Sequence, residues 1–515
     1  MPAPPPSSPD RPAAQRRSIR AIFGALMLVM LLASLDQTIV STALPTIVGE
    51  FGQIAHLSWI VTAYLLATTV VTPLYGKLGD LFGRKLVLQS AIVLFLAGSA
   101  LCGLSRSMTA LIVFRAVQGL GGGGLMVTIM AVVGDLFSPR ERGRYQGIFG
   151  GIFGLSTVLG PLIGGFFVEQ LSWRWIFYIN LPLGLVALAI IGWAFAAPAQ
   201  RRAPRIDIVG TLLLAALLTS LILLTSLGGG GIAWRSPTAL GLAAAAVLAI
   251  AGFIGVERHV AEPILPLDLF ANRVFTIACA VGFIVGLALF GSLTFMPLYL
   301  QAVKGASPTE AGMTLTPMMG GVLLTSITSG RIISHTGRYR PFPIAGTALM
   351  TIALALLATL GTATPIWAAV LYLILLGLGV GLVMQVLVLA AQNAVDFRHL
   401  GVATSGTTLF RSIGGSIGLS LFGAVFAGLL ADDLAAALPA GSALPAATAP
   451  AAIQALPAAL RSVYLQAFTG ALHPVFLGAA AAAALAFALT WFLQERPLRV
   501  AAAAYSERRN LSGDS

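Results

Sequence analysis

Charged residues are scarce in this chain. They make up 9% of its 515 residues, whereas hydrophobic residues make up 57%. A soluble domain carries roughly 25% charged residues, so this composition excludes a soluble fold with a large core. Apolar runs of about 20 residues recur along the chain, and each is long enough to cross a bilayer as a helix. The runs lack the short length and alternation of barrel strands, so we expect an all-α membrane protein rather than a β-barrel.

Cysteine and the usual catalytic clusters are nearly absent as well. The two cysteines, Cys102 and Cys279, both fall within apolar runs. They have neither disulfide nor metal-site spacing. The chain also contains no phosphate-binding loop of the ATPase kind and no cluster of His, Cys and carboxylate residues. We therefore expect no enzymatic activity, no cofactor, no metal and no direct use of ATP.

Hydropathy predicts fourteen membrane spans, at about residues 21–45, 56–76, 86–104, 109–133, 145–168, 176–196, 208–228, 236–256, 274–299, 309–330, 342–361, 365–393, 402–430 and 473–493. Lys and Arg concentrate in alternate connecting segments, which by the positive-inside rule places both termini in the cytoplasm. The formal charge of +12 is then a consequence of topology, and no nucleic-acid partner is expected. We expect a multi-pass protein of the cell inner membrane.

Two segments far apart in the chain repeat the same spacing of Gly and basic residues. Gly76-Lys77 precedes Gly83-Arg84-Lys85, and Gly330-Arg331 precedes Gly337-Arg338. Each segment joins the second and third spans of a six-span unit if the two central spans are an insertion. Repeated halves are typical of transporters that bind substrate between the halves.

The repeat predicts five regions along the chain. They are a cytoplasmic tail (1–20), a six-helix bundle (21–200), a two-helix insertion (201–260), a second six-helix bundle (261–495) and a second cytoplasmic tail (496–515). The long Ala/Pro-rich outer segment at about 431–473 either forms short amphipathic helices or is disordered.

Asp36 stands out because it is the only acid deep inside any of the apolar runs. An ionised side chain at bilayer depth is energetically unfavourable, so such a residue indicates a functional site. Arg115 lies at a similar estimated depth in a later run and is its expected partner. A proton and a cationic substrate can then compete for the carboxylate, as exchange requires. The alternative is a purely structural ion pair.

These residues resemble the major facilitator superfamily, specifically its fourteen-span drug:proton antiporters of the EmrB/QacA type. Five segments carry the resemblance: Leu35-Asp36-Gln37-Thr38-Ile39-Val40 through Ala43-Leu44-Pro45; the loop from Gly76 to Lys85; Arg115, Gln118 and Gly119; Gly154, Gly160, Pro161, Gly164 and Gly165, which resemble the antiporter motif; and Trp173-Arg174-Trp175-Ile176-Phe177 with Asn180, Pro182 and Gly184. The resemblance implies two six-helix bundles plus two extra central helices. It also implies proton-coupled export of lipophilic, cationic compounds by alternating access, and we expect a monomer.

The loop around Asp80 is interpreted as a gate latch. Gly76 and Gly83 permit a tight turn, and Arg84 and Lys85 are expected to face the anionic inner leaflet. Asp80 is expected to cap the third span or to meet an arginine of another cytoplasmic loop. The alternative is a basic loop that only sets topology.

Span five is interpreted as a pliable seal between the bundles, because small residues let helices approach closely and Pro161 permits a bend. Ordinary packing is the alternative. The candidate cavity residues are Trp59, Tyr64, Gln118, Phe295, Tyr299, Gln385 and Arg411. Lipid-facing packing is the alternative for the aromatic residues. For Arg411 we favour snorkelling to the cytoplasmic side or a loop contact.

Two rival functions remain from the sequence. One is a proton-coupled exporter of a lipid or an endogenous metabolite in the same fold. The other is a membrane sensor that does not transport.

Overall fold

The computed structural model describes residues 13–51, 57–137, 139–195, 207–227, 235–260, 262–437, 453 and 456–498. Within these ranges the chain forms helices and short connections, with no strand. The α-helices are α1 (Ala13–Phe51), α2 (Leu57–Phe82), α3 (Arg84–Gly103), α4 (Met108–Leu136), α5 (Pro139–Gln170), α6 (Trp175–Tyr178), α7 (Asn180–Ala194), α8 (Ile208–Leu227), α9 (Pro237–Glu257), α10 (Arg273–Leu293), α11 (Phe295–Ala302), α12 (Pro308–Thr336), α13 (Pro341–Leu357), α14 (Ile366–Ala394), α15 (Leu400–Ala437) and α17 (Ala458–Thr490). Two short 3₁₀ helices, η2 (Leu267–Ala271) and η3 (Phe397–His399), connect α9 to α10 and α14 to α15.

Each predicted span contains a helix, but not every helix is an unambiguous membrane span. Among the described residues, eleven helical segments are long and apolar enough to cross a bilayer. The others are α13, which has 17 residues, and α5 and α12, which are the least apolar of the long helices. Because α5 and α12 pack against each other, part of their surface never meets lipid and need not be apolar. The count of fourteen therefore stays a prediction.

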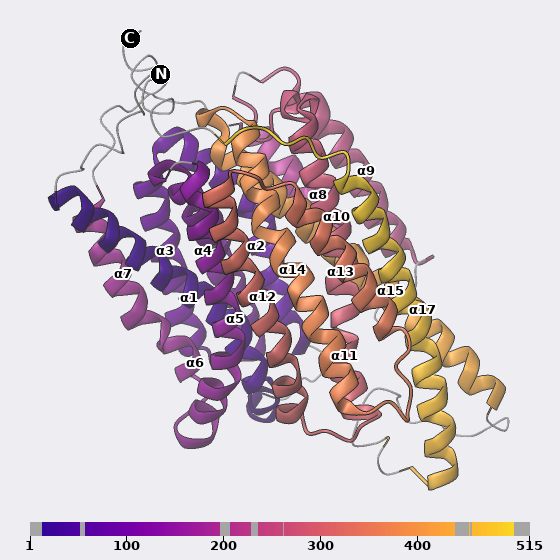
Figure 1. Ribbon diagram of the computed structural model, residues 1–515. Coiled ribbons are helices and arrows are strands. Elements are labelled where there is room, and N and C mark those ends of the chain that lie inside the picture. The colour runs from indigo at the N-terminus through magenta and orange to yellow at the C-terminus, as the bar shows by residue number, and fades with distance from the viewer. Residues whose placement is uncertain are drawn as a thin grey trace.

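The long helices run roughly parallel in two groups (Figure 1). In the N-terminal half, α1 to α7 enclose a core around Leu26, Ile92 and Phe95. In the C-terminal half, α10 to α17 enclose a separate core around Met350, Leu373 and Phe476. Each group thus buries its own apolar side chains, as two bundles would.

The two halves meet along two seams. At one seam α5 packs against α12, and at the other α2 packs against α15. The first seam is narrow because α5 presents four glycines to α12. A Cβ atom added at Gly147, Gly150, Gly151 or Gly154 would meet Ser326, Leu323 or Met319 of α12.

The α8–α9 pair lies against the second seam, where α8 contacts both α2 and α15. Leu214 and Leu218 of α8 pack with Val402 and Leu409 of α15. Thr225 Oγ1 and Ser416 Oγ are 2.8 Å apart, and Ser420 Oγ donates to the Thr225 carbonyl. The predicted insertion is thus attached to both halves at once.

Helix ends extend beyond the predicted spans. α1 begins at Ala13, inside the predicted tail, while residues 1–12 lie outside the described ranges. α15 continues to Ala437 and α17 starts at Ala458, so the predicted outer segment 431–473 is helical at both of its ends. Ala has the highest helix propensity, which explains why these Ala-rich flanks continue the helices. Residues 438–452 and 499–515 lie outside the described ranges.

Candidate functional site

Asp36 lies near the middle of α1 and is fully buried. Its Oδ2 accepts a hydrogen bond from Arg115 Nη1 at 2.8 Å, and the two side chains form an ion pair. Its Oδ1 accepts from Gln118 Nε2 at 2.8 Å and from Asn180 Nδ2 at 3.2 Å. Arg115 and Gln118 come from α4, and Asn180 is the first residue of α7. Both oxygens have donors, so the carboxylate can be buried in its charged form.

Further hydrogen bonds orient these donors. Ser99 Oγ on α3 accepts from Asn180 Nδ2 at 2.8 Å and from Gln118 Nε2 at 3.1 Å. The same hydroxyl donates to the Phe177 carbonyl at 3.0 Å. Gln118 Oε1 in turn accepts from Arg115 Nη1 at 2.7 Å. The result is one connected polar network inside an apolar bundle, in which losing one member disturbs the others.

The Arg115 guanidinium is held from two further sides. Its Nε donates to the Ile60 carbonyl at 3.3 Å, and its Cζ lies 4.2 Å from the centroid of the Tyr64 ring. Arg115 is 1% exposed and Asp36 is 0% exposed. A compound cannot touch Asp36 in this conformation, so the competition of substrate and proton for its carboxylate stays a prediction that requires the network to open. The physical reason is that Asp36 faces the interior of the N-terminal half.

The helix that carries Asp36 is tied to α5. Thr38 Oγ1 donates to the Ser156 carbonyl at 3.0 Å, and a Cβ atom added at Gly160 would collide with Thr38. α5 therefore contacts α1 two residues after Asp36. Nearly two turns before Gly160, at Gly154, the same helix contacts Met319 of α12 in the other half. A shift of α1 can reach the seam between the halves through α5.

Asp80 joins the two halves directly. Its carboxylate accepts hydrogen bonds from the backbone N–H groups of Gly401 at 3.1 Å and Val402 at 3.0 Å, in the first turn of α15. Arg84 pairs with Asp80 and also with Asp135 Oδ2, the latter at 3.2 Å. An acid at the positive end of a helix is favourable. Asp80 therefore caps α15 and meets the arginine of its own loop, rather than capping the third span or meeting another loop's arginine.

The basic residues of this loop do not face the leaflet as expected. Arg84 is buried because two carboxylates hold its guanidinium. Lys85 Nζ donates to the carbonyls of Gly192 at 2.9 Å and Phe195 at 2.5 Å, at the end of α7. A cation at a helix C-terminus is stabilised by the free carbonyls. Both residues thus stabilise the N-terminal half.

The two glycines of the loop differ in role. Gly83 has φ 89° at the break between α2 and α3, and Gly337 has φ 74° at the end of α12. Glycine adopts this left-handed backbone without strain, so the repeated segments share a turn geometry. Gly76 instead lies inside α2, where a side chain would collide with Gly401 and Ser405 of α15. It permits close approach rather than a turn.

The predicted antiporter positions of α5 do not act as one surface. Gly154 faces α12, Gly160 faces α1, and Gly165 has open space beside it. Gly164 is buried, and the side chain of Pro161 is outside what the structure describes. The seam with α12 is formed mainly by Gly147, Gly150 and Gly151, which the resemblance did not indicate. Their spacing of three to four residues on one helix was the available signal.

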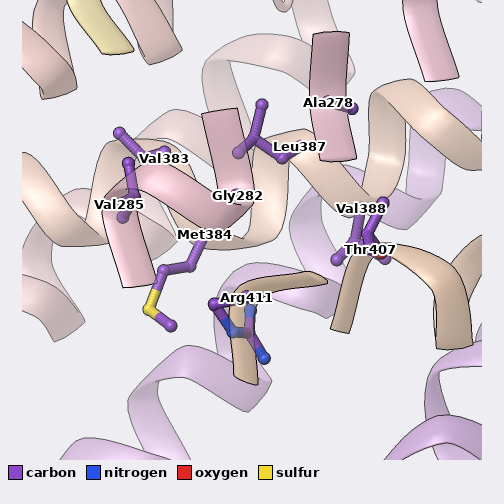
Figure 2. Close-up of a pocket in the computed structure, with 9 residues that line it drawn as sticks. All are labelled: Ala278, Gly282, Val285, Val383, Met384, Leu387, Val388, Thr407 and Arg411. Carbon is purple, nitrogen blue, oxygen red and sulfur yellow. The ribbon is translucent and has the colours of Figure 1, made fainter. Parts of the chain in front are cut away.

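Two cavities lie in the C-terminal half. One lies between α10, α14 and α15, has a volume of about 10 Å³, and is lined by Ala278, Gly282, Val285, Val383, Met384, Leu387, Val388, Thr407 and Arg411. Figure 2 shows the Arg411 guanidinium at one end and the side chains of Ala278, Leu387 and Val383 at the other. The second lies between α12 and α14, has a similar volume of about 10 Å³, and includes Gln385, Ser326 and Ser329. Each has room for about one water molecule. Of the candidate cavity residues, Arg411 and Gln385 thus line cavities.

The other candidate cavity residues lie elsewhere. Gln118 belongs to the Asp36 network, and the Tyr64 ring covers Arg115. Phe295 packs on Phe426 with ring centroids 5.0 Å apart, and the Tyr299 hydroxyl donates to the Gly361 carbonyl at 2.9 Å. Both are core residues of the C-terminal half. Trp59 is partly buried and lines neither cavity.

Sequence reasoning missed two members of the Asp36 network. Asn180 and Ser99 were not among the predicted site residues, although each is a buried polar side chain in an apolar run. A polar residue in such a run is a weak signal, because hydroxyls also bond to the carbonyl one turn back within the same helix. The contacts with Asp36 could not be read from sequence because they join helices far apart in the chain.

A further ion pair connects two segments of the N-terminal half. Arg174 Nη2 lies 2.7 Å from Glu50 Oε1, and Trp173 Nε1 donates to Glu50 Oε2 at 2.6 Å. These hydrogen bonds from Arg174 and Trp173 hold the pKa of Glu50 below its usual value. The segment between α5 and α6 is thereby attached to the end of α1.

Comparisons with known proteins agree with this architecture. A model of the Major Facilitator Superfamily matches residues 26–419. An uncharacterized MFS-type transporter of Mycobacterium tuberculosis is 47% identical over 439 residues, which are 85% of this chain and 64% of that protein. The multidrug transporter protein MdtP of Bacillus subtilis is 43% identical over 417 residues, which cover 80% of this chain and 77% of MdtP.

A solved structure shows the same fold. The crystal structure of the human organic anion transporter MFSD10 matches with a TM-score of 0.63 and 17% identity, over 93% of this chain and 100% of that one. This likeness concerns the fold alone. The chain spans less than two thirds of the length of the mycobacterial relative.

Proposed function

This chain belongs to the major facilitator superfamily, and we propose that it is a proton-coupled multidrug exporter of lipophilic, cationic compounds. The family and the fold are those of membrane transporters, not of enzymes. The multidrug function is proposed because relatives that share 43% and 35% of their residues with it are named for multidrug transport or resistance.

The buried network of Asp36 is the observation that supports proton coupling. Asp36 is an acid at bilayer depth, and its negative charge is balanced by Arg115 alone. Protonation of Asp36 would remove the ion pair and leave Arg115 as an unpaired buried cation. The network must then rearrange, and α1 is linked to the seam between the halves through α5. A proton is thereby able to bias one arrangement of the halves over another.

The remaining assignments follow from this mechanism. In the gating loop, Gly76, Asp80 and Arg84 form the latch that holds α2 on α15. Gly83 makes the turn into α3, and Lys85 fixes α3 to the end of α7. The α5 face opposite α12 forms the seal. We propose fourteen spans, because α5, α12 and α13 each continue the alternation of directions that the repeated halves require. Both termini are then cytoplasmic, and Asp80 lies at the cytoplasmic end.

A cationic substrate reaches Asp36 only after the bonds from Arg115 and Gln118 open. Proton and substrate therefore act on different conformations of one network, rather than sharing one open carboxylate. This is the form of coupling that the closed geometry supports.

The test is efflux by Asp36→Asn in a host that lacks its own pumps. Asn is similar in size to Asp and can keep hydrogen bonds to Gln118 and Asn180, so the protein should fold while proton-driven efflux falls to background. Glu310→Gln is the matched control, because Glu310 is an exposed acid at the start of α12. Efflux of a cationic dye is measured with and without a protonophore. Wild-type rates in Asp36→Asn, or rates that ignore the protonophore, would contradict the proposal.

Two other functions fit parts of the structure. An exporter of a lipid or an endogenous metabolite would use the same network, and a panel of dyes separates it from a drug exporter. A sensor without transport would show no proton flux when substrate is added to proteoliposomes.

A further inference from the structure

Arg411 is a partly buried cation that the proposed mechanism does not use. It lies eleven residues after the start of α15, about 16 Å along the helix at 1.5 Å per residue. A hydrocarbon layer is about 30 Å thick, so Arg411 is near the middle of its span. An arginine side chain is too short to reach either surface from that depth. In the structure the Arg411 side chain lines the cavity between α10, α14 and α15, and snorkelling to the cytoplasmic side stays an untested expectation.

No acid of the surrounding helices is positioned to neutralise Arg411. Among the described residues it forms no hydrogen bond and no ion pair. Two of the three helices that line the cavity, α10 and α14, contain no Asp or Glu. The acids of α15 are Asp432 and Asp433, the nearer of which is about 31 Å along the helix. The remaining deep acid, Asp36, is already paired with Arg115.

An arginine stays charged in proteins, and an unpaired charge in an apolar interior is strongly unfavourable. The cavity offers it little compensation, because eight of the nine lining residues are Ala, Gly, Val, Leu or Met, or the hydroxyl residue Thr407. The Thr407 hydroxyl already donates to the carbonyls of Ala403 and Thr404. The site therefore combines an apolar wall with one free cation.

We propose that this cavity binds the acidic group of a lipophilic substrate, with Arg411 as the oxyanion-binding residue. A carboxylate, sulfonate or phosphonate accepts two parallel hydrogen bonds from a guanidinium. The cavity is narrow in this conformation, so binding requires α10, α14 and α15 to separate; Val285, Val383 and Leu387 then contact the apolar body, and Met384 adapts to its shape. The inference rests on the proposed export function and narrows its substrate class: compounds that carry an acidic group beside their lipophilic cation are preferred over those that lack one.

A matched pair of dyes tests the inference. One is a rhodamine with a free carboxylate, and the other is the same rhodamine with that carboxylate esterified. Both carry the same lipophilic ring cation. The free acid is a zwitterion, and the ester keeps a net positive charge. Binding is measured by fluorescence polarisation on the purified full chain in detergent. We expect the wild type to bind the free acid more tightly, and Arg411→Gln to lose about tenfold or more in affinity for it, as expected for a charge-assisted hydrogen bond. Affinity for the ester should be unchanged, which also shows that the variant is folded.

Two further variants complete the design. Arg411→Lys keeps the charge but not the paired geometry, so it should retain part of the preference for the free acid. Arg331→Gln removes the same charge from an exposed position on α12 and should match the wild type. Equal losses for both dyes in Arg411→Gln would show a structural role and overturn the inference. No preference in the wild type, or no change in Arg411→Gln, would overturn it as well.

Efflux of the same dyes separates this inference from the proposed function. If Asp36→Asn abolishes efflux of the ester, and Arg411→Gln spares efflux of the ester but slows efflux of the free acid, both hold. If the preference for the free acid depends on Arg411 but the protonophore does not change the efflux rate, the oxyanion site is supported and proton coupling is contradicted. If efflux is proton-driven but Arg411→Gln exports both dyes at wild-type rates, the oxyanion site falls alone.

Discussion

Asp36 can be buried in its ionised form only when a nearby positive charge balances its carboxylate. In the structure Arg115 provides that balance, while Gln118 and Asn180 satisfy the second carboxylate oxygen. Removing either member of the ion pair leaves an uncompensated charge in the bundle. Removing both at once leaves none. The energetic link between the two residues can therefore be measured apart from transport.

We predict that Arg115→Ala destabilises the protein by about 3–5 kcal/mol, the usual effect of leaving one buried charge unpaired. The double variant Arg115→Ala with Asp36→Asn should recover most of that loss, because no charge remains to be balanced. Neither variant should export dye. Thermal unfolding of the detergent-purified proteins gives the stabilities. A double variant no more stable than Arg115→Ala would mean that the two charges are not energetically coupled.

At the scale of the helix, α5 makes close contacts on two of its faces. Gly147, Gly150, Gly151 and Gly154 bring it close to α12, whereas Gly160 brings it close to α1. Both approaches depend on the absence of a Cβ atom. Changes on either face should thus affect transport more than the stability of the helix itself.

We predict that Gly147→Ala lowers the rate of efflux several-fold, because its Cβ would collide with the backbone of Ser326 and separate the halves. Such overpacking typically costs about 1–3 kcal/mol. Gly165→Ala is the matched control. It adds the same methyl group on the same helix, where nothing lies within 4 Å. Both substitutions improve helix propensity equally. Equal rates in the two variants would show that the α5–α12 contact does not limit transport.

For the molecule as a whole, Asp80 links the two halves through its hydrogen bonds to α15. Its carboxylate spans from α2 to the first turn of α15, at the same end where Gly76 and Gly401 approach each other. Opening that end of the molecule must break these contacts. Changing these contacts should therefore alter the relative stability of the conformations and leave the cavity unchanged.

We predict that Asp80→Asn slows turnover several-fold while dye binding stays within twofold of the wild type. Asn still caps the helix, as Asp does, but it loses the charge that pairs with Arg84 and with the positive end of α15. Rates are measured in proteoliposomes and affinities by fluorescence polarisation. Asp268→Asn, at an exposed position in η2, is the control. A large loss of affinity with normal turnover would contradict the latch.

The sequence predicted those features that depend on local pattern. Asp36 and Arg115 stood out because ionisable residues are rare in apolar runs, and their contact is direct in the structure. Gly83 and Gly337 were paired by spacing, and both adopt a left-handed backbone.

Features that depend on contacts between distant helices were missed or misplaced. Arg84 was expected at the leaflet, but its partner Asp135 lies 51 residues later in the chain. Phe295 and Tyr299 were expected in a cavity, yet composition does not distinguish a cavity wall from a packed core, where both residues lie. The two network residues Ser99 and Asn180 were hidden for the same reason.

The position of α8 has a consequence for compounds dissolved in the bilayer. Lipophilic molecules concentrate among the acyl chains, and the shortest way from there to the space between the halves is sideways through a seam. α8 lies over the α2–α15 seam and is fixed to Ser416 and Ser420. Within the described ranges no helix covers the α5–α12 seam in this way, and its outer surface carries exposed apolar side chains such as Leu155 and Leu324. The two seams therefore differ in their access to lipid. We expect a lateral entrance to open between α5 and α12, where four glycines of α5 form the contact.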